Sequence, residues 1–278
     1  VQDIHPDLAI EAGILRNRLG ISLARALERF VYRAAGKIVV ISEGFKANLT
    51  AKGVPPEKIE VIPNWVDTGF ISPMQKDNPV ARRLGLADRF VVMYSGTISI
   101  SSNRALECAL EAAARFQGER KPLLAIVGEG LERDNIKRKA EGLGMDNVRF
   151  FPLQPYEDLP ALLASSDVLL VPLDAQKSAL SVPSKLYNFM AAGRPILGFA
   201  PKDSEVAALI ERTGCGVAVD PGAPDGMARA LAGLMDSPAE REELGRRART
   251  FVEENFSAGI ILPKYDRLIG FMTDHDQK

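Results

Sequence analysis

The chain has 278 residues, of which 46% are hydrophobic and 6% aromatic, a length and composition that suit one large or two smaller α/β domains and argue against disorder. Lys and Arg number 35 against 36 Asp and Glu, so the net charge of −1 offers no global field to select nucleic acid, and any anion site must be local. No apolar run reaches the roughly eighteen residues of a spanning helix and no secretory signal opens the chain, so we expect a soluble, cytoplasmic protein. The two cysteines, Cys108 and Cys215, lack metal-ligand spacing and are expected to be buried thiols.

The first part of the chain alternates short apolar strands with helices. Because the sequence opens with Val1 and its first residues read as the end of a strand, we expect it to have been cut from something longer. Strands are predicted at residues 1–4, 37–41 and 59–62, and helices at residues 8–35 and, capped by Ser42, at residues 43–53. This order predicts parallel pairing.

Residues 68–88 are rich in Pro, Gly, Asn and charge, which predicts a linker. Beyond it, six strands of Val, Ile, Leu and Phe alternate with helices, which predicts a doubly wound parallel sheet. The predicted strands are residues 90–95, 123–127, 148–151, 168–171, 195–200 and 215–219. The last three predicted helices are residues 224–235, 238–255 and 263–272.

In the stretch of residues 182–198, the side chains that could bind a ligand lie at the N-terminal end. Pro183 suits the first turn of a helix, Ser184 offers a hydroxyl among unpaired backbone N–H groups, and Lys185 adds a positive charge, so an anion is welcome there. Apolar residues at helical spacing then predict one buried face, formed by Leu186, Phe189 and Met190. On this stretch alone, an ordinary helix with a capped start is an equally good interpretation.

The loops that follow the predicted strands support the anion interpretation. In a doubly wound sheet, ligands bind outside the carboxyl ends of the strands, where glycine allows close approach to main-chain N–H groups. Four such loops contain Gly96 with Thr97, Gly128 with Glu129 and Gly130, Leu153 with Gln154, and residues 181–185. A single loop of this kind is more often a tight turn, but four on one edge favour a phosphorylated ligand.

Several other classes of site are absent from the sequence. The Gly-x-Gly-x-x-Gly fingerprint of dinucleotide oxidoreductases, the Walker loop and the Gly-x-Ser-x-Gly elbow do not occur. The only histidines are His5 and His275, so a Ser-His-Asp hydrolase is excluded.

Five motifs together resemble one family. They are residues 40–43 (Val-Ile-Ser-Glu), 61–67 (Val-Ile-Pro-Asn-Trp-Val-Asp), 127–130 (Val-Gly-Glu-Gly), 166–172 (Ser-Asp-Val-Leu-Leu-Val-Pro) and 191–195 (Ala-Ala-Gly-Arg-Pro). In order and spacing, the sequence is similar to retaining glycosyltransferases of family 4, which have the two-domain fold called GT-B. Within the family it resembles bacterial exopolysaccharide, O-antigen and colanic-acid enzymes.

The resemblance implies transfer of a sugar from a nucleotide diphosphate sugar, with UDP-sugars prevailing, to a saccharide acceptor that is expected to be lipid-linked. It implies no metal cofactor, because helix N-termini and basic side chains hold the leaving diphosphate. It also implies three parts: the last portion of an N-terminal acceptor domain (residues 1–65), a C-terminal nucleotide-sugar domain (66–262), and a helix that crosses back (263–278).

Roles carried over from the family fall mainly on the four loops. Donor-binding residues are expected at Gly96, Thr97, Arg104, Gly128, Glu129, Gly130, Leu153, Gln154, Pro183, Ser184, Lys185, Leu186 and Asn188. Asp3 is the candidate catalytic residue, with a turn cap as the alternative. The family's Glu-x7-Glu pattern falls on Leu180 and Asn188, neither of which is acidic. Arg104 is the candidate to replace the basic residues that are missing after the first glycine loop, and a solvent-facing position is an equally good interpretation of it. Donor binding is therefore expected to depend heavily on Lys185.

Two other functions stay open at this point. A truncated chain of this kind would be a nucleotide-sugar-binding module without catalysis. An epimerase of the same two-domain fold is weaker, because its cleft requires carboxylates and histidines that the sequence does not offer. Lipid acceptors suggest contact with the inner face of the membrane through the Leu- and Arg-rich residues 14–33, although a core helix with a basic outer face is the favoured interpretation of that segment.

Overall fold

The computed structural model describes residues 1–11, 13–118, 121–173, 184–202 and 204–275. The chain divides into two compact units. The first contains Val1–Trp65 and the segment from Ala258 onward, and the second contains Val66–Ala175 and Ser184–Ser257.

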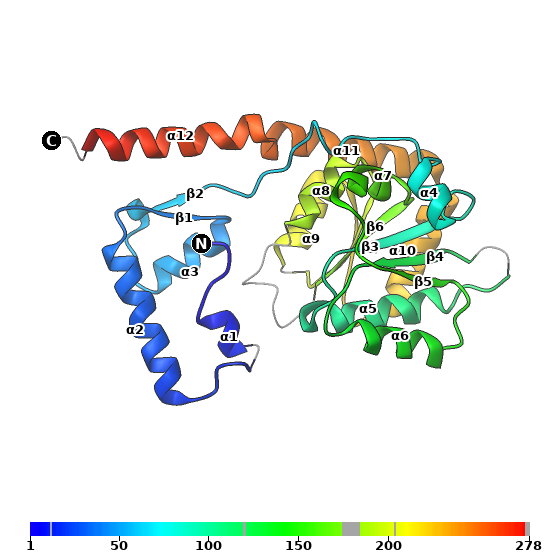
Figure 1. The fold of residues 1–278 in the computed structure, drawn as a ribbon, viewed down its shortest axis with the longest axis horizontal. Coiled ribbons are helices and arrows are strands. Elements are labelled where there is room, and N and C mark those ends of the chain that lie inside the picture. Colours follow the sequence, from blue (N-terminus) through cyan, green and yellow to red (C-terminus); the bar gives the residue numbers. More distant parts are fainter. Residues whose placement is uncertain (12, 119–120, 174–183, 203, 276–278) are drawn as a thin grey trace. The chain divides into compact units, whose positions relative to one another are not determined.

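The first unit is built on two parallel strands, β1 (Ile38–Val40) and β2 (Ile59–Val61), which pair from Ile38↔Ile59 to Val40↔Val61 as predicted (Figure 1). Between them lies α3 (Glu43–Ala51), whose first turn is capped by Ser42, because its Oγ accepts a hydrogen bond from the Phe45 N–H at 3.2 Å. A short 3-10 turn, η1 (Pro56–Lys58), leads into β2. The expected strand at residues 1–4 is not formed.

The long helix expected at residues 8–35 is two helices, α1 (Asp7–Glu11) and α2 (Arg18–Ala34). Gly13 has a φ of +68°, which ends the first, and the Asn17 side chain accepts from the Leu19 N–H, which starts the second. The core-helix interpretation of this segment is wrong, because no residue of α2 is buried and Leu19, Leu23 and Phe30 are 81%, 73% and 67% exposed.

The last helix, α12 (Ala258–His275), begins five residues before the predicted start and runs through Pro263. Proline cannot donate to the carbonyl four residues back, here that of Gly259. Gly259 is exposed, so water can bind its carbonyl and the helix continues. In the described part of the chain, none of the helices combines the length and the hydrophobicity that crossing a bilayer requires.

The second unit is a six-stranded parallel sheet in the order β5-β4-β3-β6-β7-β8, which confirms the doubly wound prediction. The strands are β3 (Val91–Ser95), β4 (Leu123–Val127), β5 (Val148–Phe151), β6 (Val168–Pro172), β7 (Ile196–Phe199) and β8 (Gly216–Val219). The β3, β4 and β6 side chains are almost wholly buried, as strands covered on both faces require.

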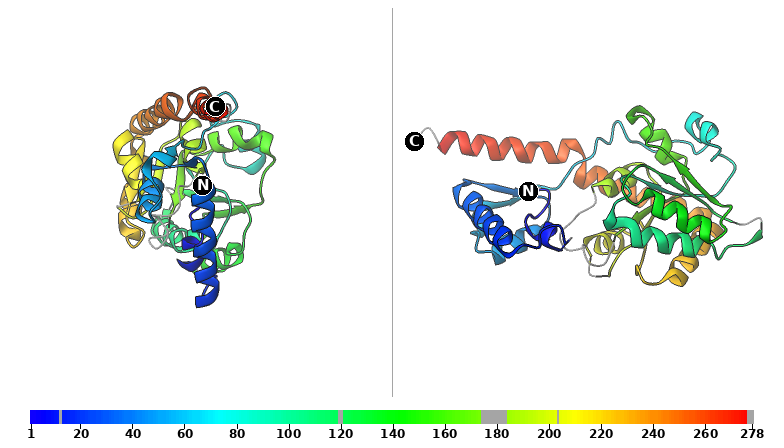
Figure 2. Two further views of the ribbon diagram at one scale, coloured as in Figure 1. Left: turned by 90° about the vertical axis from the view of Figure 1, so that its left-hand side faces the viewer. Right: turned by 60° about the horizontal axis from the view of Figure 1, so that its bottom comes forward.

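Helices cover this sheet on both sides (Figure 2). On one side, α5 (Ile100–Ala113) packs against α6 (Arg133–Gly142) and α10 (Pro224–Asp236). Of the remaining helices of this unit, α11 (Pro238–Phe256) packs against α8 (Lys185–Ala191) and α9 (Glu205–Thr213). The expected linker contains a short helix, α4 (Pro79–Leu84), which packs against α7 (Leu159–Ala164), and the turn η3 (Tyr156–Asp158) precedes α7. Both cysteines are buried, as predicted.

Candidate functional site

The centre of the second unit's sheet is the point where its strand order reverses. β3 and β6 are neighbours, paired at Val92↔Val168 and Met93↔Leu169. From β3 the chain proceeds through α5 to β4 on one side, whereas from β6 it proceeds through α8 to β7 on the other. The strand order therefore reverses between β3 and β6, and the carboxyl edge at such a reversal is where parallel α/β sheets bind ligands.

The loops after β3 and β4 are locked to each other through their main chains. The Gly96 N–H donates to the Val127 carbonyl at 3.0 Å, and the Ile98 N–H donates to the Glu129 carbonyl at 2.9 Å. A Cβ on Gly128 would lie 2.0 Å from the Gly96 carbonyl oxygen, and one on Gly130 would lie 2.2 Å from that of Ile98. Both glycines have positive φ angles of 142° and 151°, so no other residue fits this contact.

Lys185 lies against the first of these loops. Its Nζ is 3.1 Å from the Tyr94 hydroxyl and 4.4 Å from the centroid of the Tyr94 ring. A Cβ on Gly96 would be only 2.9 Å from the same Nζ. The structure thus brings the predicted cation to the predicted glycine loop, at the switch point of the sheet.

The rest of the predicted lysine stretch lies on α8 or just before it. Ser184 is exposed, has helical backbone angles, and makes no side-chain cap hydrogen bond. Leu186 is buried (1% exposed), so its side chain packs in the interior, whereas Asn188 is half-buried. Pro183 lies outside the described residues.

The loop after β5 continues the same edge, since the Gly128 N–H donates to the Phe151 carbonyl at 3.0 Å. The Leu153 side chain is 69% exposed. The Gln154 side chain is already engaged, because its amide donates to the Pro152 carbonyl and its oxygen accepts from Arg83. Main-chain groups are therefore the better candidates for contacts with a base here.

Two predicted residues are not brought to this group. Arg104 is an exposed residue of α5, and no contact between it and the glycine loops is recorded among the described residues. Thr97, in contrast, lies in the first glycine loop and is exposed. Asp3 lies on an exposed bend of the first unit.

Two residues of this edge, Tyr94 and Arg133, were not predicted from the sequence as part of the site. Tyr94 was counted only as part of a strand, although its place near the strand's carboxyl end was a usable signal. Arg133 pairs with Glu129 at 3.3 Å and lies 6.0 Å from the Phe150 ring, so Glu129 is tied to the first turn of α6. The two residues stand four positions apart in the sequence.

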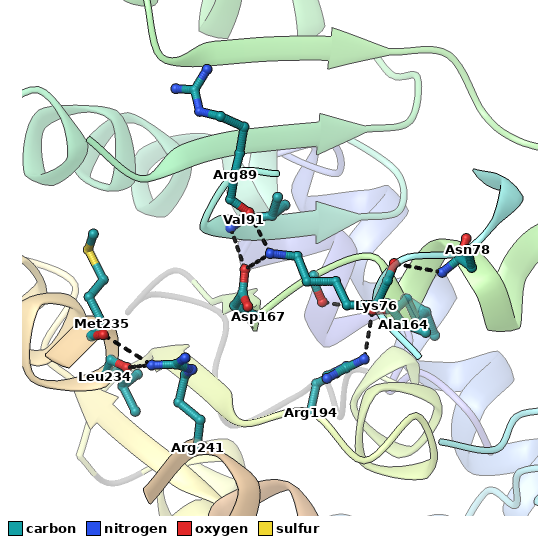
Figure 3. A network of polar contacts seen from close by, with 12 residues as sticks. Lys76, Asn78, Arg89, Val91, Ala164, Asp167, Arg194, Leu234, Met235 and Arg241 are labelled. Carbon is teal, nitrogen blue, oxygen red and sulfur yellow. Dashed lines mark hydrogen bonds and ion pairs between the residues drawn. The ribbon is translucent and has the colours of Figure 1, made fainter. Parts of the chain in front are cut away.

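A second polar cluster lies near the amino ends of the strands (Figure 3). Lys76 bonds Asp167 and the Arg89 carbonyl, each at 2.5 Å, and Asp167 also accepts from the Val91 N–H at 2.7 Å. Arg194 donates to the carbonyls of Met74 and Ala164. Burial lowers the pKa of the Arg194 guanidinium, and nearby Asp167 opposes that shift. A cavity of about 460 Å³ adjoins the cluster, but these contacts fasten the segment before β3 and therefore have a structural role.

Comparison with known proteins assigns the chain to a family. The family model described as "Glycosyl transferases group 1" matches residues 81–251, and the model "Glycosyl transferase 4-like domain" matches residues 1–65. Probable glycosyltransferase WbjE of Pseudomonas aeruginosa is 30% identical over 95% of this chain and 66% of its own length. The putative colanic acid biosynthesis glycosyl transferase WcaI of Escherichia coli is 32% identical over 80% of this chain and 55% of its own length. The chain thus spans between about half and two thirds of these relatives.

Solved structures show the same fold. Sucrose-phosphate synthase from Thermosynechococcus elongatus superposes with a TM-score of 0.77 at 20% identity, covering 96% of this chain and 66% of that one. Anabaena HepE in complex with UDP and glucose superposes with a TM-score of 0.77 at 18% identity, covering 92% of this chain and 68% of that one. The fold is that of the GT-B glycosyltransferases. With the family model matching well over half of its residues, the chain belongs to the group 1 glycosyl transferases.

Proposed function

We propose that the protein transfers a sugar from a UDP-sugar to a lipid-linked saccharide acceptor, with retained anomeric configuration, in the synthesis of a bacterial surface polysaccharide. The relatives named for colanic acid biosynthesis and as a probable glycosyltransferase support the polysaccharide role. HepE was solved with UDP and with UDP-glucose, which supports a uridine donor.

One observation carries the proposal: the Lys185 ammonium group lies at the switch point, against the Gly96 loop. In the proposed reaction the bond between the sugar's anomeric carbon and the diphosphate oxygen breaks, a bond to an acceptor hydroxyl oxygen forms, and the proton of that hydroxyl passes to the released diphosphate. The departing diphosphate gains negative charge as that bond breaks. A positioned ammonium group stabilises this charge more in the transition state than in the bound donor, so Lys185 serves catalysis as well as binding, and the proposal requires no metal ion there.

Calorimetric titration with UDP and with GDP tests the donor site. We expect the wild-type chain to bind UDP in preference to GDP, and Lys185→Ala to weaken UDP binding at least roughly tenfold, since a charge-assisted contact to phosphate is lost. Lys121→Ala is the matched control, because that lysine pairs with Asp146 at the opposite end of β4. Equal binding by the Lys185 and Lys121 variants would place the diphosphate elsewhere.

The second candidate is a nucleotide-sugar-binding module without catalysis. In that function the glycine loops and Lys185 hold the donor, and no glycosidic bond is formed. Turnover of a radiolabelled UDP-sugar with a lipid-linked acceptor separates the two functions. Transfer of label to the acceptor supports the enzyme, and binding without transfer supports the module.

We place the protein on the cytoplasmic face of the membrane, in peripheral contact with it. The supporting feature is α2, whose exposed apolar side chains accompany four arginines, Arg18, Arg25, Arg29 and Arg33. Its one acidic residue, Glu28, is paired with Lys52 at 2.5 Å. An amphipathic helix of this composition suits an anionic lipid surface.

A further inference from the structure

Tyr94 is buried completely (0% exposed) even though it carries a hydroxyl group. It is the next residue after Met93, at which the recorded pairing of β3 with β6 ends, so it lies where the two central strands part. A buried hydroxyl group requires hydrogen-bond partners. Both of its partners belong to the candidate donor site: it donates to the Thr97 carbonyl at 2.5 Å and accepts from Lys185 Nζ at 3.1 Å.

We propose that Tyr94 is a positioning residue, which holds the Lys185 ammonium group in place for the diphosphate of the donor. The inference rests on the proposed function, because it assumes that Lys185 contacts that diphosphate. Neither the family motifs nor the composition of the loops pointed to this tyrosine.

A lysine side chain is flexible, so holding its ammonium group in place has an entropic cost. Its four-carbon stem loses much rotamer freedom when the ammonium group binds an anion. At Lys185 that freedom is already restricted, because Nζ is hydrogen-bonded to the hydroxyl and lies 4.4 Å from the centre of the aromatic ring, a cation–π distance. A cation fixed before the ligand arrives binds it more tightly.

The directions of the two hydrogen bonds at the Tyr94 hydroxyl group suit this role. Because the tyrosine proton goes to the Thr97 carbonyl, the hydroxyl oxygen is free to accept from Lys185. This uses one of the three N–H donors of the ammonium group. The contact with Tyr94 does not itself occupy the other two, and among the described residues no other hydrogen bond of Lys185 is recorded.

Tyr94 joins two parts of the candidate site, the loop after β3 and the start of α8. Thr97 belongs to the loop after β3, and Lys185 begins α8, which follows β6. Gly96 leaves the space for this link, since a Cβ there would be 2.9 Å from Lys185 Nζ. Through one side chain, the cation and the glycine loop therefore keep a fixed relationship.

The alternative is that Tyr94 only fills the core, where it packs in the same cluster as Ile98 and Leu106. Tyr94→Phe separates the two roles, because it keeps the ring and removes the hydroxyl group. Tyr187→Phe is the matched control: Tyr187 is another buried tyrosine of this unit, and its ring stacks on Phe256 at 4.4 Å.

The test compares binding of UDP with binding of uridine, which has no phosphate. We expect Tyr94→Phe to weaken UDP binding roughly three- to tenfold, as for a lost hydrogen bond, and to leave uridine binding unchanged. In the Lys185→Ala background the Tyr94 substitution should cost nothing further, since Tyr94 acts through that lysine. Tyr187→Phe should change neither affinity.

Three results would overturn the inference while leaving the proposed function intact: an unchanged UDP affinity in Tyr94→Phe, an equal loss for UDP and uridine, or an additional loss in the Lys185→Ala background. A wild-type chain that binds neither UDP nor GDP would overturn the proposed function and the inference with it. If UDP fails and GDP binds, the same comparison is made with GDP and guanosine.

A measurement on the wild-type chain does not depend on any variant. Lys185 Nζ lies over the Tyr94 ring, 4.4 Å from its centre, so we expect the NMR signals of the side-chain protons next to Nζ to be shifted upfield relative to those of exposed lysines. An ordinary chemical shift for these protons would contradict the geometry on which the inference is built.

Discussion

Gly128 passes so close to Gly96 that a methyl group on residue 128 would lie 2.0 Å from the Gly96 carbonyl oxygen. This contact joins the loops after β3 and β4, both of which belong to the candidate donor site. It involves main chain on one side, so no rotamer change can relieve it. The carboxyl edge of the sheet therefore depends on two residues that have no side chain.

We expect Gly128→Ala to destabilise the second unit by at least about 2 kcal/mol, because it adds a steric clash to a strained positive φ. Urea unfolding followed by circular dichroism measures the effect. Gly142→Ala is the control, since its Cβ would have no neighbour within 4 Å and the residue is helical. Equal midpoints for the two variants would show that the loops separate easily.

The Lys76–Asp167 pair fastens the segment before β3, and Asp167 also accepts from the Val91 N–H. We expect Asp167→Asn to lower the free energy of unfolding by about 1–3 kcal/mol, because two partly buried donors lose a charged acceptor. Differential scanning calorimetry measures the shift. Asp77→Asn, which breaks the exposed pair with Arg82, should leave the melting temperature unchanged. A larger shift for Asp77 would reverse this interpretation.

Burial raises the pKa of Tyr187 to about 12, with a smaller contribution from Glu205. The unfolded chain ionises this tyrosine near its ordinary value of about 10, whereas the folded chain resists ionisation. The stability that this group contributes is therefore complete below about pH 10 and is lost as pH rises toward 12. We expect Tyr187→Phe to show a shallower loss of stability between these values, measured by urea unfolding at a series of pH values. Identical pH profiles would show that Tyr187 is accessible to water.

If α2 contacts lipid, the wild-type chain should sediment with phosphatidylglycerol vesicles and much less with phosphatidylcholine vesicles, because its arginines are attracted to anionic headgroups. Leu23→Glu should abolish this sedimentation. Ile260→Glu is the control, since Ile260 is an exposed apolar residue (44%) of α12. Equal sedimentation of both variants, or no preference for anionic lipid, would reject α2 as the contact surface.

Much of the second unit followed from its sequence. Strands β4 and β5 have the predicted bounds, because runs such as Leu123–Val127 are apolar throughout and flanked by turn residues. The loops after β3, β4 and β5 lie at strand ends, so their shared edge followed from parallel pairing alone. The proximity of Lys185 to Gly96 followed in the same way, since β3 and β6 are neighbours at a switch point.

Other features were misjudged because local signals competed, or because they depended on contacts between distant residues. The break between α1 and α2 had local signals in Gly13 and Asn17, but apolar periodicity outweighed them. The start of α12 was misplaced because proline was given its usual position in the first turn. The place of Tyr94 near a strand's carboxyl end signalled that it borders the site, but its contact with Lys185 did not follow from the sequence, because that lysine is ninety-one residues away.

The pairing recorded between the two central strands covers only Val92↔Val168 and Met93↔Leu169, whereas β3 pairs with β4 along five residues. The sheet thus consists of two three-stranded halves that share a short seam. A nucleotide diphosphate held by the Gly96 loop on one side and Lys185 on the other would span this seam and connect the two halves of the sheet. Donor binding should then slow amide hydrogen exchange in strands on both sides of the seam, including strands that never touch the ligand.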